Sequence, residues 1–203
     1  MSNEDFEGIP VFVCNDAFLR AYSAPYWVTG DPNVLRVFRG IAQQTNNILA
    51  PHIFSTMGGD EDGITYLDRK SVPNADEHGT HQKYPLSFDL EDEVYDGSDT
   101  VLLALQVAVW MGFATIYLLG ADYGYTEDQT HFYGKRVGHE SVGLDQYPTK
   151  IRTMTDAVTA VEGWGIKVFN CSRDSKLMYP KFKEIKDAIA HLRRECRERD
   201  SKL

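Results

Sequence analysis

Short apolar runs alternate with longer amphipathic or mixed segments along the chain, a pattern that predicts strands alternating with helices. Two runs of β-branched and aromatic residues stop at polar or glycine residues and predict strands at 11–14 and 26–29. The second run leads to Asp31, a good helix cap, and Pro32, which suits a first helical turn. We therefore expect a helix over 34–42.

The next stretch is the least regular part of the pattern. Residues 52–56 fit a third strand, and residues 58–88 are rich in Gly, Asp, Asn, His and Pro with little periodicity. A short strand is expected at Ile64–Tyr66 within it. We interpret about 57–96 as a long irregular excursion over the sheet.

The clearest units lie in the second half. A helix is predicted from Gly97 to Met111, ended by Gly112, and it is apolar nearly all round. The strand predicted at Thr115–Leu119 has no polar alternation either, so both elements are expected to be deeply buried. A helix at about Lys150 to Trp164 and a strand at 166–170 repeat the arrangement. A last helix is predicted from Lys181 to Arg199, with one apolar stripe that we expect to dock on the sheet without chemistry: Ile185, Ala188, Ile189, Leu192 and Cys196.

Alternating helices and strands predict an α/β fold with a mostly parallel sheet and helices on both faces. The chain has 203 residues, which fits one domain spanning 1–203 better than two. Its hydrophobic content of 42% is ordinary for a protein that folds unaided.

Charge and cysteine usage narrow the function classes. The net charge of −9 favours neither nucleic acid nor a membrane surface as a partner. The three cysteines show no CxxC spacing, so neither a disulfide framework nor a zinc knuckle is indicated. The first residues are acidic and no apolar run approaches the ~20 residues of a membrane span. We expect a cytoplasmic protein, and a homo-oligomer stays open.

Polar residues follow four of the predicted strands. In an open α/β sheet, ligands bind outside the carboxyl ends of strands, so these positions are the first candidates for a site. Each residue type is also common in ordinary turns, and only the recurrence at four strand ends favours a site. The candidates are Asn15 and Asp16, Gly30 and Asp31, Gly120 to Tyr123 with Asp122, and Asn170 to Ser172.

The start of the buried helix offers free amides and the positive end of a helix dipole to an anion or nucleotide. Ser98, Asp99 and Thr100 lie there, and simple capping of the helix is the alternative. Asp122 and Asp31 likewise suit a sugar hydroxyl, a metal or the bracing of a turn.

Histidines supply the acid and base candidates. His131 and His139 lie in the polar loop 126–147 beyond the central strand, where an imidazole can act as a general base. A surface histidine without a role is the alternative. His78 and His81 are close in sequence but match no recognised metal-ligand spacing, and no GxSxG, HExxH or phosphate-loop signature occurs.

Taken in order, several motifs resemble one family. The motifs are Val11–Asn15, Asp31–Pro32, Asp99–Thr100, the run Ile116–Asp122, His131–Gly134 with His139, and Val168–Cys171. Their order resembles the bacterial sialyltransferase-like fold, whose wider superfamily includes the 6-hydroxymethylpterin diphosphokinases. Members usually begin with a strand and a glycine-rich loop, and the printed sequence begins after that point.

The resemblance implies a Rossmann-like domain and a nucleotide-sugar site. The site would comprise Asn15, Asp31, the Asp99–Thr100 helix start and Gly120 to Tyr123. It also implies that a loop histidine removes the proton of the acceptor hydroxyl. His139 is the closest match, and His131 is the alternative.

Three functions follow. The first is transfer of a sugar from a cytidine monophosphate donor to a hydroxyl acceptor, which needs no separate cofactor. The second is an ATP-dependent pterin pyrophosphokinase, which needs magnesium near carboxylates such as Asp31, Asp99 and Asp122. The third is a protein that binds a nucleotide or a protein partner without catalysis, suggested by the missing glycine-rich loop.

Overall fold

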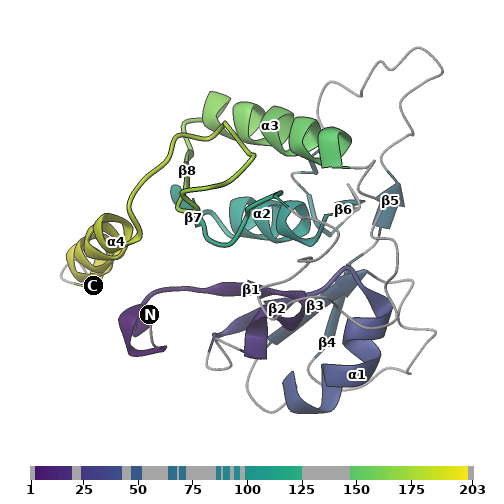
Figure 1. The fold of residues 1–203 in the computed structure, drawn as a ribbon. Coiled ribbons are helices and arrows are strands. Elements are labelled where there is room, and N and C mark those ends of the chain that lie inside the picture. Colours follow the sequence, from purple (N-terminus) through teal and green to yellow (C-terminus); the bar gives the residue numbers. More distant parts are fainter. Residues whose placement is uncertain are drawn as a thin grey trace.

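The computed structural model describes residues 3–19, 24–42, 47–51, 64–67, 69–71, 86–87, 89–91, 94–96, 99–124 and 147–200. These segments form a mixed α/β structure (Figure 1). In chain order the elements are η1 (Asn3–Phe6), β1 (Phe12–Cys14), η2 (Asn15–Leu19), β2 (Tyr26–Val28), α1 (Pro32–Ala42), β3 (Asn47–Pro51), β4 (Ile64–Leu67), β5 (Arg69–Ser71), β6 (Val94–Asp96), α2 (Thr100–Trp110), β7 (Thr115–Leu118), α3 (Tyr147–Gly163), β8 (Lys167–Asn170) and α4 (Ile185–Asp200).

All strand pairs in the described segments are parallel. One sheet has the order β1-β2-β3-β4, and two smaller pairs are β5-β6 and β7-β8. The predicted strands at 11–14, 26–29, 64–66, 115–119 and 166–170 are confirmed as β1, β2, β4, β7 and β8. The sequence did not predict β3, β5 or β6, and the strand expected at 52–56 lies outside the described residues.

Helix α2 lies at the centre of the core, as its apolar sequence predicted. Every residue from Leu102 to Ala108 is buried, and Gly112 ends the segment at φ +81°. Leu102 and Leu105 pack with α3, β7 and β8. On its other side, α2 contacts residues of β2, β4 and β6, and Figure 1 shows it between α3 and the β1–β4 sheet. A fully buried leucine stabilises a fold by roughly 1.5–3 kcal/mol, so this double contact contributes much of the stability.

One polar residue interrupts this apolar helix. Gln106 is fully buried, and its side-chain oxygen accepts the amide protons of Ser87 at 3.0 Å and Tyr95 at 3.1 Å. Its side-chain nitrogen donates to the carbonyl oxygens of Tyr95 at 2.8 Å and Leu102 at 3.3 Å. Gln106 therefore connects β6 and the segment around Ser87 to the centre of the molecule.

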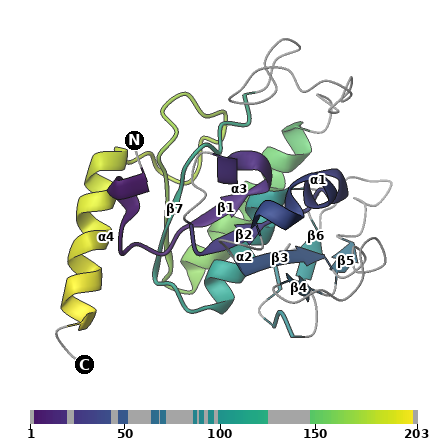
Figure 2. The same ribbon diagram turned by 90° about the horizontal axis from the view of Figure 1, so that it is seen from below.

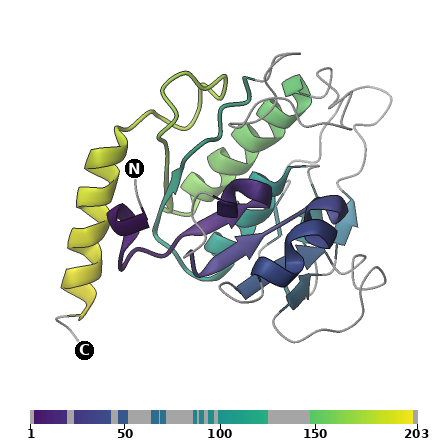
Figure 3. The ribbon, with the colours of Figure 1, turned by 60° about the horizontal axis from the view of Figure 1, so that its bottom comes forward.

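The other helices lie around this core. Helix α1 lies across the β1–β4 sheet from α2, as Figures 1 and 3 show, and it begins at Pro32 as the capping pattern predicted. Helix α3 confirms the predicted helix near 150–164. No helix in the described segments is long and apolar enough to cross a membrane.

The start of the last helix was predicted wrongly. Residues 181–183 run beside β8 instead: Asn170 N donates to Lys181 O at 3.0 Å, and Lys183 N donates to Asn170 O at 2.8 Å. Because these backbone bonds hold the segment extended, α4 begins only at Ile185. Ala188 of its apolar stripe is buried. Figures 2 and 3 show α4 beside the N-terminal segment, where an Arg193 guanidinium nitrogen donates to Asp5 O at 3.1 Å.

Candidate functional site

The ends of β1 and β2 meet the start of α2 in one hydrogen-bonded cluster. Asn15 directly follows β1, and its side-chain oxygen accepts from the Thr29 hydroxyl at 3.0 Å and from the Thr100 hydroxyl at 3.1 Å. Asn15 has φ +50°, a left-handed conformation that asparagine adopts more readily than most residues. One amide side chain thus joins three segments that are far apart in the sequence.

Gly30 allows the loop after β2 to approach α2 closely. Its N–H donates to the Thr100 hydroxyl oxygen at 3.3 Å, and a Cβ at this position would lie 3.2 Å from that oxygen. Any larger residue would crowd the Thr100 side chain. The next residue, Asp31, accepts from the backbone N–H of Asn33 at 2.8 Å and of Val34 at 3.4 Å, which confirms it as a cap of α1.

Asp99 caps α2 and also faces the end of β7. One carboxylate oxygen accepts from Val101 N at 2.8 Å, and the other accepts from the Tyr123 hydroxyl. Burial raises the pKa of the Asp99 carboxyl above its ordinary value of 3.8, against the lowering effects of the Tyr123 and Val101 hydrogen bonds and of the Lys150 charge. Both carboxylate oxygens are engaged, so the capping role left open by the sequence is the one that the structure shows.

The end of β1 adds a thiol to the cluster. The Cys14 thiol contacts Thr100 O at 3.7 Å, and burial, with a smaller contribution from the Asp99 charge, raises its pKa to about 12. Tyr123 is buried with φ +49°. A thiol with that pKa stays protonated near neutral pH.

A second group of contacts fixes the loop after β7 against the loop after β8. Gly120 N donates to the Ser172 hydroxyl at 2.9 Å, and Lys176 N donates to Asp122 O at 2.7 Å. The Ser175 hydroxyl donates to Ala121 O at 2.6 Å. The backbone of the loop is therefore held at three successive residues, while the side chain of Asp122 is exposed.

The structure places most of the predicted site residues in these two groups of contacts. Asn15, Asp99, Thr100 and Tyr123 lie in a single cluster, which Asp31 joins through its N–H to the Thr29 hydroxyl at 3.2 Å. Gly120 and Asp122 belong to the neighbouring loop group. The predicted residues Ser98, His131 and His139, and also His52, His78 and His81, lie outside the described residues.

Thr29 contributes hydrogen bonds to the first group, and Ser172 and Ser175 contribute hydrogen bonds to the second. None of the three was singled out individually from the sequence. Their only signal is position, since each follows a strand end or lies in the loop after one. Within the described segments, no group of three or more His, Cys, Asp or Glu side chains could hold a metal ion.

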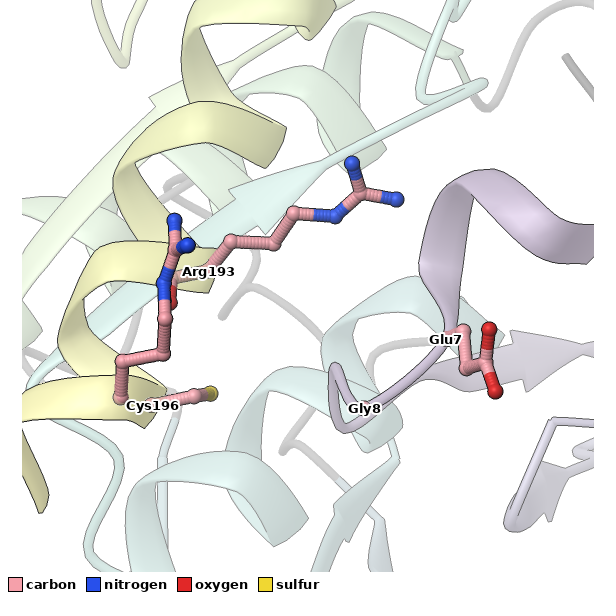
Figure 4. Close-up of a pocket in the computed structure, with 5 residues that line it drawn as sticks. Glu7, Gly8, Arg193 and Cys196 are labelled. Carbon is pink, nitrogen blue, oxygen red and sulfur yellow. The ribbon is translucent and has the colours of Figure 1, made fainter. Parts of the chain in front are cut away.

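A separate cavity of about 370 Å³ lies between the N-terminal turn and α4 (Figure 4). It is lined by Glu7, Gly8, Arg193, Cys196 and Arg197. Arg197 Nε donates to Arg193 O at 3.1 Å, and Arg193 reaches the backbone of η1. None of the predicted site residues lines this cavity.

Comparisons of the chain with protein-family models, with curated proteins and with solved structures find no match.

Proposed function

We propose that the edge formed by the ends of β1, β2 and β7 binds a nucleotide-linked sugar, and that the protein transfers the sugar from a cytidine monophosphate donor to a hydroxyl acceptor. The observation that carries this proposal is the Asn15 side chain at the carboxyl end of β1, which bonds Thr29 at the carboxyl end of β2 and Thr100 at the start of α2. The resemblance to the sialyltransferase-like fold supplies the donor class.

The proposal includes one Rossmann-like sheet with helices on both faces. Two observations support it. Helix α2 contacts β1 and β2 and also packs on β7 and β8, so one helix covers both parallel sheets. The Phe12 ring of β1 meets the Phe113 ring, just before β7, edge to face at 5.8 Å between centroids. In such a sheet, the β1 and β7 ends share the edge where nucleotides bind.

Some polar groups of the site are hydrogen-bonded within the protein, and others have no described partner and can bind a ligand. The hydroxyl of Thr100 donates to Asn15 and accepts from Gly30, and both oxygens of Asp99 are engaged. By contrast, no described residue bonds the side-chain nitrogen of Asn15 or the carboxylate of Asp122. We assign two donors on Asn15 and two acceptors on Asp122 to the ligand, for which a phosphate or ribose and a sugar hydroxyl are suitable partners.

Transfer itself needs a base. In a direct displacement, a bond forms between the acceptor oxygen and the sugar while the bond from the sugar to the phosphate breaks, and the acceptor proton passes to the base. His139, with His131 as the alternative, remains the predicted base. The departing nucleotide phosphate carries the electron pair away, so the site must also stabilise that charge.

Calorimetric titration with cytidine monophosphate, cytidine and ATP, with and without magnesium, tests the binding. We expect cytidine monophosphate to bind without magnesium. A strict magnesium requirement with preference for ATP would favour the pterin pyrophosphokinase, and no heat or thermal shift with any nucleotide would exclude a nucleotide site.

Turnover is tested separately with nucleotide sugars. We expect His139→Ala to abolish transfer while nucleotide affinity is kept, and His131→Ala to do so if the alternative base operates. Tight binding without any turnover in the wild type would contradict the transferase and leave a nucleotide-binding protein.

A further inference from the structure

A lysine beside the cluster has no hydrogen-bond acceptor among the described residues. Lys150 belongs to the first turn of α3, is half-buried, and holds its Nζ 5.7 Å from the centroid of the Tyr147 ring. Tyr147 packs in the same core cluster as Tyr123, the residue whose hydroxyl bonds Asp99. Helices α2 and α3 also contact each other, and the charge of Lys150 acts on Asp99 at the start of α2.

The ammonium is close to Asp99 but does not pair with it. Its charge lowers the pKa of the Asp99 carboxyl, opposing burial, which places the two groups within electrostatic reach. The oxygens of Asp99 are already engaged by Val101 N and the Tyr123 hydroxyl. Within the described segments, no hydrogen bond or ion pair engages Lys150.

The side chain of Lys150 is half-buried. Its ammonium has three N–H donors, and any of them that leaves water loses solvation unless another acceptor replaces it. The ring of Tyr147 stabilises the charge but accepts no conventional hydrogen bond from it. At the start of α2, Val101 N is engaged by the Asp99 carboxylate and is not available to an anion. A cation from another element would favour an anionic ligand at this edge, and Lys150 is placed to supply it.

We propose that Lys150 binds a phosphate oxygen of the nucleotide at this edge. This inference rests on the proposed function and extends it by naming the residue that recognises the phosphate. A lysine suits that role because its compact charge on a flexible stem follows a phosphate without strict geometry. Lys150 also offers charge to the phosphate as the leaving group departs.

The test compares cytidine monophosphate with cytidine, because the two ligands differ only in the phosphate. Lys150→Met keeps the length of the stem and removes the charge, and Lys150→Arg restores a cation. We expect Lys150→Met to weaken cytidine monophosphate binding roughly ten- to hundredfold, as for a lost charged hydrogen bond, and to leave cytidine affinity unchanged. Lys150→Arg should recover most of the loss.

Lys167→Met is the matched control, because Lys167 is exposed at the amino end of β8, away from the carboxyl edge. It should leave both affinities unchanged. Thermal melts verify that each variant folds, and Lys150→Gln provides a second neutral variant if Lys150→Met does not.

The outcomes separate the two proposals. If the wild type binds cytidine monophosphate and both neutral variants bind it equally well, Lys150 does not recognise the phosphate and the proposed function stands. An equal loss of cytidine and cytidine monophosphate affinity would show a structural role for Lys150. Absence of nucleotide binding in the wild type would overturn both proposals.

Discussion

Two polar clusters, one at the start of α2 and one between β7 and α4, differ in how completely their hydrogen bonds are used. The edge cluster of Asn15, Thr100, Asp99 and Tyr123 leaves the Asn15 side-chain nitrogen without a described partner. The cluster under α4 joins Tyr117, Lys183 and His191 in a closed chain. A closed network braces the fold, whereas an open one has groups left for a ligand.

Lys183 is the donor in one of the two hydrogen bonds of this chain. Lys183 Nζ lies 3.2 Å from the Tyr117 hydroxyl and can only donate, so that oxygen accepts from it. The Tyr117 hydroxyl also hydrogen-bonds His191 Nδ1 at 3.0 Å, and the tautomer of His191 decides which of the two donates. Lys183 also lies 4.6 Å from the Phe169 ring centroid. Each of the three side chains has a hydrogen-bond partner in the chain, which connects α4 to β7.

The largest expected effect on stability is at Gln106, whose buried side chain makes four hydrogen bonds. Gln106→Leu keeps similar volume but leaves the N–H groups of Ser87 and Tyr95 buried without their acceptor. Each such group costs about 1–3 kcal/mol, so the free energy of unfolding should fall by ~3 kcal/mol or more. Urea denaturation measures it. A loss below about 1 kcal/mol would mean that the network around Gln106 is not closed in solution.

A substitution in the cluster under α4 should lower the free energy of unfolding by less and leave ligand binding unchanged. Tyr117→Phe removes the hydroxyl that connects Lys183 to His191 and should cost about 1 kcal/mol of unfolding free energy. Nucleotide affinity should not change. Tyr26→Phe is the control, because no described residue bonds the Tyr26 hydroxyl. A drop in nucleotide affinity in Tyr117→Phe alone would break the comparison between the two clusters.

The pH dependence of stability should identify Asp99. Burial raises its folded pKa above 3.8, so the folded protein holds the proton more tightly than the unfolded chain. The stabilisation that results is complete below pH 3.8 and is lost as the pH rises through the folded pKa. The amide side chain of the Asp99→Asn variant does not titrate and still caps α2. The free energy of unfolding of this variant relative to the wild type should therefore increase as the pH rises through the folded pKa of Asp99.

Unfolding free energies measured at several pH values from acid to neutral provide the check for Asp99. A parallel pH dependence in Asp99→Asn and the wild type would show that the Asp99 carboxyl is not buried as described.

The sequence predicted the elements that have a strong local pattern. An apolar run or a helix cap specifies each of β1, β2, α1, α2, β7, α3 and β8. Asp99 and Gly112 marked the two ends of α2. Asn15 was a candidate because it follows a strand, and Asp99 and Thr100 were candidates because they open a helix; the structure brings these residues together.

What the sequence did not predict depends on long-range pairing. β5 consists of Arg69, Lys70 and Ser71, which have no strand pattern, and it forms because it pairs in register with Val94–Asp96. Gln106 lies in an apolar helix, and its role is visible only once β6 is beside it. Tyr117 and His191 are 74 residues apart in the sequence, so no local pattern indicated their bond.

Asp122→Asn tests most directly the claim that the open edge is a nucleotide site. The amide keeps the size of the exposed side chain and loses its charge, so the melting temperature of the free protein should stay as it is. Asp156→Asn, an exposed change on the outer face of α3, is the control. Thermal melts with and without cytidine monophosphate should show a smaller ligand-induced shift in Asp122→Asn alone. A large fall in the melting temperature of free Asp122→Asn, with the ligand-induced shift intact, would show that Asp122 is a turn brace.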